Sequence, residues 1–137
     1  MEHAPVAVIV NDGDREVTYA NNNWFVLTGH SHVDNFKDVD WISMIHEDDT
    51  ELAKSMWPKV CAGEPAHAEL RLKSWWKDAH GSPFPTWVMT TAWPEMENGS
   101  LKQVIGTMID ISHLKFAEGV QTSRIEQAIE AKRQQEK

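Results

Sequence analysis

The 137-residue chain has a single cysteine, Cys61, and fewer basic than acidic residues, 13 against 21. A lone cysteine excludes an internal disulfide and favours a reducing setting inside the cell, so we expect a cytoplasmic protein. The formal net charge of −8 argues against nucleic acid as a partner and against docking on an anionic membrane. The apolar segment APVAVIV is too short for a membrane span and lacks the basic flank of a secretory signal.

The sequence also lacks the motifs of a nucleophile elbow, a phosphate-binding glycine loop and a zinc-hydrolase helix. Asp48 and Asp49 are adjacent carboxylates, but they precede a predicted helix, where the helix dipole favours acidic side chains. His30 and His32 lie near the acidic segment 46–49 and could form a metal site. Because loop histidines are more commonly just solvated, we predict no metal site, and we expect a regulatory protein and not an enzyme.

What the chain does contain is a pattern of short strands and helices around an aromatic-rich core with seven tryptophans. Alternating or β-branched apolar runs predict five strands, at residues 5–10, 15–20, 66–76, 85–93 and 101–110. The first two are separated by the turn NDGD, so they should form a hairpin. Two strands, several helices and a three-stranded meander indicate an α+β fold with one antiparallel sheet.

Two helices are predicted between the hairpin and the meander. Residues 21–30, NNNWFVLTGH, begin with asparagines suited to an N-cap and end near Gly29, a plausible C-terminal cap. Residues 47–63 have acids in the first turn and an apolar face of Leu52, Met56 and Val60. Pro58 is awkward within this second helix, because its ring would disrupt or end it.

The last segment, residues 112–137, is rich in strong helix formers and differs from the rest. We therefore divide the chain into a domain at 1–111 and a C-terminal, coiled-coil-like helix at 112–137. Residues of this helix at alternating spacings of three and four form a coiled-coil seam, the stripe that would face a second helix. The seam is marginal, because only half of its residues are apolar. Such a helix is barely stable alone, so we expect a homodimer. The sequence stops within the helix without a glycine or proline stop, so we expect the chain to be part of a longer protein. The seam comprises Ile111, Leu114, Glu118, Gln121, Ile125, Ala128, Lys132 and Gln135.

Five short motifs, in order along the chain, resemble those of the PAS domain family. They are YAN at 19–21, FVLTGH at 25–30, WISMIHEDD at 41–49, Gly81 before a strand led by Trp87, and GTMIDIS at 106–112. The last looks like the family's G…DIT signature with Ser112 in place of threonine. The tail resembles the helix that joins such a domain to the catalytic part of a sensor histidine kinase. Its end, EAKRQQE, is similar to the segment of fungal hybrid kinases just before the phosphorylated histidine.

The resemblance implies a five-stranded antiparallel sheet with helices on one face and a pocket between the two layers. It also implies which side chains face that pocket from the third, fourth and fifth strands and from the helical side. The candidates for the pocket lining are Phe25, Trp41, Ile45, Met56, Val60, Leu70, Leu72, Val88, Thr90, Ala92, Gly106 and Met108.

A cofactor in this pocket is unknown, and we expect none. Flavin-binding photoreceptors of the family form an adduct through a cysteine, but the corresponding region has none, and Cys61 lies elsewhere. Haem-binding members supply a histidine from the long helix, and residues 47–63 contain none. Met56 or Cys61 could ligate iron, but both residue types more commonly pack in cores. A non-covalent flavin, a small apolar ligand and a solid core without ligand all remain open.

The outward sheet face is predicted to bear Trp87, Met89 and Trp93, which is too apolar a surface to be left bare. In the PAS family this face commonly packs on a flanking helix or a second subunit. Together with Leu114, Ile125 and Ala128 of the helix, it is the predicted dimer surface.

Two functions follow from these patterns. The first is a sensor in signal transduction that dimerises and regulates a histidine kinase of a two-component system, in the same chain, through the C-terminal helix. The alternative is a ligand-free module for protein–protein interaction and dimerisation. In the first, the junction Asp110, Ile111 and Ser112 would transmit the signal. Asp110 would accept hydrogen bonds that hold strand and helix in register, and Ser112 would cap the helix.

Overall fold

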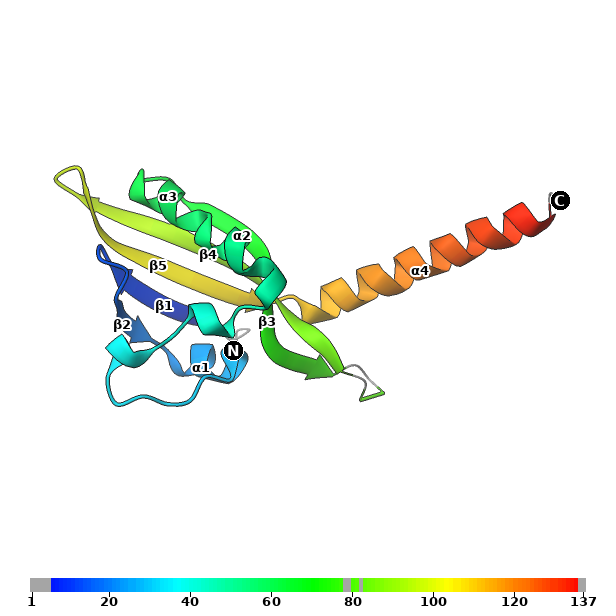
Figure 1. Cartoon of the computed structure of the whole chain (residues 1–137), viewed down its shortest axis with the longest axis horizontal. Helices are drawn as coiled ribbons and strands as arrows, with labels where there is room; N and C mark the ends of the chain where they lie inside the picture. The colour runs from blue at the N-terminus through cyan, green and yellow to red at the C-terminus, as the bar shows by residue number, and fades with distance from the viewer. Residues whose placement is uncertain (1–5, 78–79, 82, 136–137) are drawn as a thin grey trace, which may run out of the picture.

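The computed structural model of the chain describes residues 6–77, 80–81 and 83–135. A single antiparallel sheet with the strand order β2-β1-β5-β4-β3 forms its body (Figure 1). The predicted α+β class and five-stranded sheet are confirmed. The outermost residues of the predicted segments, 1–5 and 136–137, lie outside the described residues. The strands are β1 (Ala7–Asp12), β2 (Val17–Ala20), β3 (Ala66–Lys77), β4 (Pro83–Glu97) and β5 (Ser100–Asp110).

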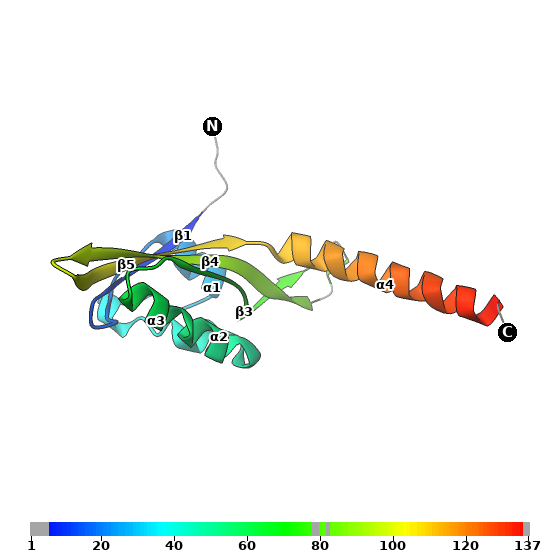
Figure 2. The same cartoon turned by 90° about the horizontal axis from the view of Figure 1, so that it is seen from above.

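The helical segments between β2 and β3 cover one face of the sheet (Figure 2). Between the two layers lies a hydrophobic core whose most deeply buried side chains include Trp24, Ile45, Leu70, Leu72 and Val88. Alternation along β3 and β4 places Leu70, Leu72 and Val88 inward, as the sequence pattern predicted, whereas Trp24 comes from α1 and Ile45 from the segment after η2. The helical segments are α1 (Asn22–Thr28), α2 (Thr50–Lys54), α3 (Met56–Cys61) and three 3₁₀ turns, η1 (Phe36–Asp38), η2 (Ile42–Met44) and η3 (Glu47–Asp49).

Helix α1 is capped at both ends as its sequence predicted. The Asn21 side chain accepts a hydrogen bond from the backbone N–H of Trp24 at 2.9 Å. Gly29 ends the helix with φ at 76°, a left-handed conformation that glycine adopts without steric cost. Asn21 also binds β1, because its Oδ1 accepts from the Val8 N–H at 3.0 Å. One side chain therefore fixes where the hairpin ends and the helical layer begins.

The single helix predicted for residues 47–63 is wrong in detail, because the chain divides it into η3, α2 and α3. The break falls at Ser55, and Pro58 lies in the first turn of α3, where its missing N–H leaves no helical bond unmade. The break also rotates the apolar face. Leu52 is exposed, whereas Ala53 is buried with Val60.

Helix α4 (Ser112–Gln135) continues from β5 and projects away from the sheet (Figures 1 and 2). Its first turns rest on the far end of the β3–β4 hairpin. There the Phe116 ring lies 5.6 Å from that of Trp76 and 5.5 Å from that of Phe84. Within the described part of the chain, every helix is too short or too polar to cross a membrane.

Candidate functional site

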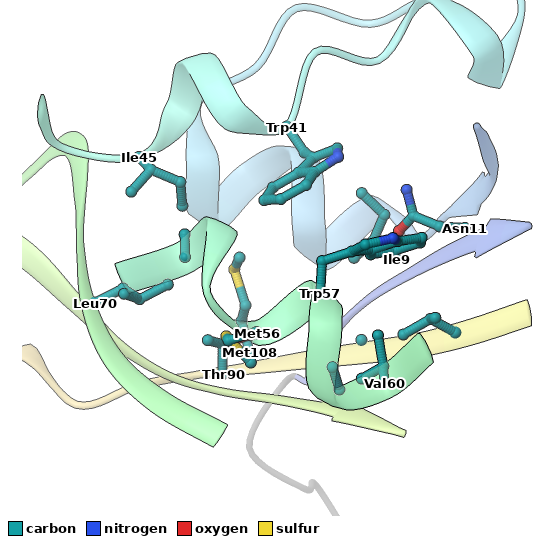
Figure 3. A pocket seen from close by; sticks show the side chains of 14 residues that line it. Ile9, Asn11, Trp41, Ile45, Met56, Trp57, Val60, Leu70, Thr90 and Met108 are labelled. Atoms are coloured by element: carbon teal, nitrogen blue, oxygen red, sulfur yellow. The ribbon is translucent and has the colours of Figure 1, made fainter. Parts of the chain in front are cut away.

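A small cavity lies between the sheet and helices α2 and α3 (Figure 3). Its volume is about 80 Å³. The walls come from β1, β3, β4 and β5 on one side, and from α2, α3 and the segment before them on the other. The lining residues are Ile9, Asn11, Trp41, Ile45, Ala53, Met56, Trp57, Val60, Leu70, Thr90, Ala92, Val104, Gly106 and Met108.

Most of the predicted pocket residues lie around this cavity. They are Trp41, Ile45, Met56, Val60, Leu70, Thr90, Ala92, Gly106 and Met108. Strand parity and register explain the agreement on the sheet side, because Thr90 is paired with Met108 and Ala92 with Gly106 on β4 and β5. These pairs bring their side chains to one face at one level of the sheet.

Three predicted residues lie outside the lining and belong to the buried core beside it: Phe25, Leu72 and Val88. Leu72 forms a bridge with Ile45, and Val88 is paired with Asp110 at the end of β5, beyond the level of the cavity. Parity predicted the correct face for these strand residues but not how far along the strand the open space extends.

Five lining residues were not predicted: Ile9, Asn11, Ala53, Trp57 and Val104. The alternation of β1 would have identified Ile9 and Asn11, since Ala7, Ile9 and Asn11 are buried in turn. Val104 has the same parity as Gly106 and Met108. By contrast, Ala53 and Trp57 depend on where the helix breaks: the sequence indicated a disruption at Pro58, and the break falls three residues earlier, at Ser55.

The cavity is apolar apart from Asn11 and Thr90. The Asn11 amide nitrogen donates to the Arg15 carbonyl at 3.1 Å. Gly106 allows β1 and β5 to approach closely, because a Cβ at this position would lie 3.1 Å from Cγ2 of Ile9. Pockets for drug-sized ligands are roughly 300–1,000 Å³, so this cavity has room only for a much smaller, apolar group.

Trp57 forms one wall of the cavity, and Arg15 covers that tryptophan from outside. The Arg15 guanidinium carbon lies 4.8 Å from the centroid of the Trp57 ring, within the range of a cation–π contact. This contact joins α3 to the β1–β2 turn. It holds the helical wall against the sheet on the side where β1 contributes Ile9 and Asn11.

The residues present do not fit haem or a flavin adduct. Neither histidine nor cysteine lines the cavity, and Cys61 is exposed elsewhere. Met56 is the lining residue that the sequence offered as an iron ligand, but a volume of about 80 Å³ holds neither macrocycle nor isoalloxazine ring. Among the described residues, no group of three histidine, cysteine or acidic side chains is placed to hold a metal ion.

The helical wall is joined to β3 by the ion pair of Asp49 and Arg71. Oδ2 of Asp49 accepts from the Arg71 backbone N–H at 2.7 Å and from its Nε at 3.0 Å, and Oδ1 accepts from Nη2 at 2.9 Å. The Asp49 side chain is only 12% exposed. Hydrogen bonds from the Arg71 side chain lower the pKa of Asp49, and the same bonds raise the pKa of Arg71.

Close to this ion pair, across Trp87 of β4, residues 110–112 join β5 to α4. Oδ1 of Asp110 accepts from the Ser112 N–H at 2.9 Å, which satisfies one of the free donors at the start of the helix. The predicted capping role of Ser112 is wrong. Ser112 is the first residue of α4, it is fully buried, and its Oγ accepts from the Trp87 N–H at 2.9 Å. The Ile111 N–H donates to the Trp87 carbonyl at 2.8 Å.

The helices between β2 and β3 lie on the other face of the sheet, so within the described residues the outer face meets only the first turns of α4, where Lys115 lies over Trp87 (Figure 2). Trp93 and Ile105 are cross-strand partners on this face, and Trp93 is 52% exposed. Met89 is half-buried opposite Ile109, which is 47% exposed. Trp87 differs from the other predicted face residues, because cations from β3 and α4 lie over its ring. On α4, Leu114 and Ile125 are 63% and 61% exposed, and Ala128 is also exposed.

Comparison with known proteins agrees with this geometry. The family model of the PAS fold matches residues 1–111. A domain of a putative light and redox sensing histidine kinase from Haloarcula marismortui is 25% identical, with a TM-score of 0.63 over 80% of this chain and 92% of its own. A sensory box histidine kinase/response regulator from Burkholderia thailandensis has a TM-score of 0.66 and 16% identity over 91% and 92%.

A light-oxygen-voltage protein from Rhodobacter sphaeroides also shares the fold, with a TM-score of 0.59 and 14% identity over 80% of this chain and 61% of its own. No curated protein sequence matches the chain. A sheet with helices on one face, a cavity between the layers and a helix leaving the last strand define a sensory signalling module. The chain belongs to the PAS family.

Proposed function

We propose that this PAS domain senses a signal inside the cell and, as a homodimer, regulates a histidine kinase in the same chain through α4. The domain itself is a regulatory module without catalytic residues of its own. A change in the cavity or on the outer sheet face alters β5. Because α4 follows β5 after a single residue, Ile111, the change shifts the helix.

The observation that carries this proposal is the set of bonds between β4 and the start of α4. Both backbone groups of Trp87 are bound by consecutive residues of the junction, Ile111 and Ser112. These bonds couple a movement of the start of α4 to the strand next to it. The signal that passes this way is limited by the difference in ligand affinity between the two states of the domain.

A second candidate function is a ligand-free module for protein–protein interaction and dimerisation, and the small volume of the cavity favours it. The two functions are distinguished by the absorbance of the purified protein from 300 to 700 nm and by mass spectrometry of a denatured extract. A stoichiometric small molecule supports the sensor. A protein without chromophore or ligand, isolated from its native source, supports the interaction module.

Asp110 provides the test of the signalling role. In the intact kinase, we expect Asp110→Asn to keep the fold and to change kinase output, because it removes the negative charge next to the α4 N-terminus but keeps an oxygen that accepts from Ser112. Asp110→Ala removes both charge and acceptor and should change output more. The measurement is autophosphorylation of the intact protein, with circular dichroism to check the fold.

The matched control is Glu97→Gln, which removes an exposed carboxylate from the far end of β4, away from the junction. It should leave kinase output unchanged. Unchanged output in both Asp110 variants would contradict the proposed role of the junction.

A further inference from the structure

Trp87 is the residue of the sheet at which β3, β4 and α4 meet. Its cross-strand partner on β3 is Arg71, whose guanidinium carbon lies 5.4 Å from the centroid of the Trp87 ring. The Nζ atom of Lys115, from α4, lies 5.1 Å from the same centroid. Both distances are within the range of cation–π contacts. One ring therefore contacts a cation from the edge strand and a cation from the helix that leaves the sheet.

Arg71 connects this ring to the helical wall of the cavity. Three hydrogen bonds join Arg71 to Asp49, and Asp49 immediately precedes α2. Helix α2 and the following α3 supply the lining residues Ala53, Met56, Trp57 and Val60. Because the pair is bidentate, a displacement of Asp49 also displaces the plane of the guanidinium that faces Trp87.

Lys115 connects the same ring to the output helix. Its Nζ pairs with Glu69 of β3 and lies 3.4 Å from Glu118 on the next turn of α4. Hydrogen bonding to Glu69, reinforced by Glu118, raises the pKa of Lys115, so the side chain stays charged over the physiological range. Each cation at the ring thus has its own acidic partner, and one of these acids, Asp49, immediately precedes α2, which forms part of the cavity wall.

We propose that Trp87 couples the cavity wall to α4 through Arg71 on one side and Lys115 on the other. A movement of α2 that displaces Asp49 changes the contact of Arg71 with the indole ring, and the ring then changes its contact with Lys115. This route deepens the proposed function, since it rests on α4 as the output. It is distinct from the route through β5, because it runs from Arg71 on the edge strand β3 across Trp87 of β4 to Lys115 of α4.

The test measures whether a change at Asp49 is felt at the start of α4 in the 137-residue chain. The Ile111 amide donates to Trp87 and the Lys115 amide donates to Ile111, so hydrogen exchange of these two amides reports how firmly the first turn is held. We expect Asp49→Asn to raise both exchange rates about fivefold, the lower end of typical couplings between sites. The Gly29 amide, bound to Phe25 in α1, serves as the reference for global stability.

Asp49→Asn is then made in the Trp87→Leu variant, where it should no longer raise the exchange rates of the Ile111 and Lys115 amides. A rise that is equal at Gly29 is global destabilisation and overturns the proposal. A selective rise that persists without Trp87 shows another route and also overturns it. Glu95→Gln is the matched control, since it breaks the surface pair with Lys102, 3.6 Å apart, and should leave all three amides unchanged.

A reciprocal experiment covers the case in which a substitution at Asp49 or Trp87 prevents folding. Lys115→Met changes a single side chain of α4, and coupling free energies are equal in both directions. Exchange of the Arg71 amide, which donates to Asp49, should therefore rise selectively. An unchanged Arg71 amide overturns the proposal. None of these measurements involves kinase output, so a failure here is distinguishable from a failure of the proposed function.

Discussion

Arg71→Met should lower the free energy of unfolding by about 3 kcal/mol, because it leaves Asp49 as a buried charge without its partner. The variant keeps one of the three hydrogen bonds to Asp49, the one from the backbone N–H. The methionine side chain still covers part of Trp87, so the loss reports charge and hydrogen bonding more than packing. Denaturant unfolding followed by circular dichroism measures the difference.

The pH dependence of this loss identifies its cause. The pKa of Asp49 is lowered in the folded protein, chiefly by the hydrogen bonds from Arg71. The carboxylate therefore adds stability above its unfolded pKa, near 3.9, and this stability is lost as the pH falls through the lower folded value. The difference in free energy of unfolding between the native protein and Arg71→Met should have its full size at pH 7 and should shrink below about pH 4.

A surface ion pair supplies the control for this experiment. Lys102 and Glu95 lie 3.6 Å apart with both side chains about half exposed, so Lys102→Gln should cost less than about 1 kcal/mol. A difference for Arg71→Met that stays constant down to pH 3 would contradict the electrostatic account. It would instead attribute the loss to contacts of the arginine stem with Trp87.

The sheet was predictable because the alternation of inward and outward side chains along a strand can be read from a few consecutive residues. Thr90, Ala92 and Met108 lie at the cavity because period-two alternation, once anchored by the motifs, leaves no freedom about which face they occupy. The helical wall was less predictable. Pro58 indicated a disruption of the predicted helix but not that the break falls at Ser55, and the position of Trp57 follows from that break.

The connections between layers could not be predicted, since they join residues far apart in sequence. Asp49 and Arg71 are 22 positions apart, and either acid of the Asp48–Asp49 pair could have been the partner. The sequence indicated only that an acid suits a helix start. Likewise, strand parity predicted Trp87 for the outward face, but its contact with Lys115 depends on the direction in which α4 leaves the sheet.

Ending the chain after Ser112 should convert a dimer into a monomer. Residues 121–135 of α4 are exposed along their whole length, including Ile125 and Ile129, so nothing in the described chain supports this part of the helix. Helices of this kind are marginal in isolation, and pairing with a second copy would bury both isoleucines. Light scattering on the two chains measures the change.

A single charge should weaken the same dimer without removing the helix. In a parallel pair, Ile125→Glu places the new glutamate of one copy opposite the same glutamate of the other copy across the seam. The repulsion should raise the dimer dissociation constant about tenfold to a hundredfold, or roughly 1.4 to 2.8 kcal/mol in binding free energy. Gln127→Glu is the matched control, because it adds the same charge two positions along, off the seam. If the truncated chain stays dimeric, the helix is not the main contact. The exposed Trp93 and Ile105 of the outer sheet face then become the interface, and Trp93→Glu should dissociate the dimer instead.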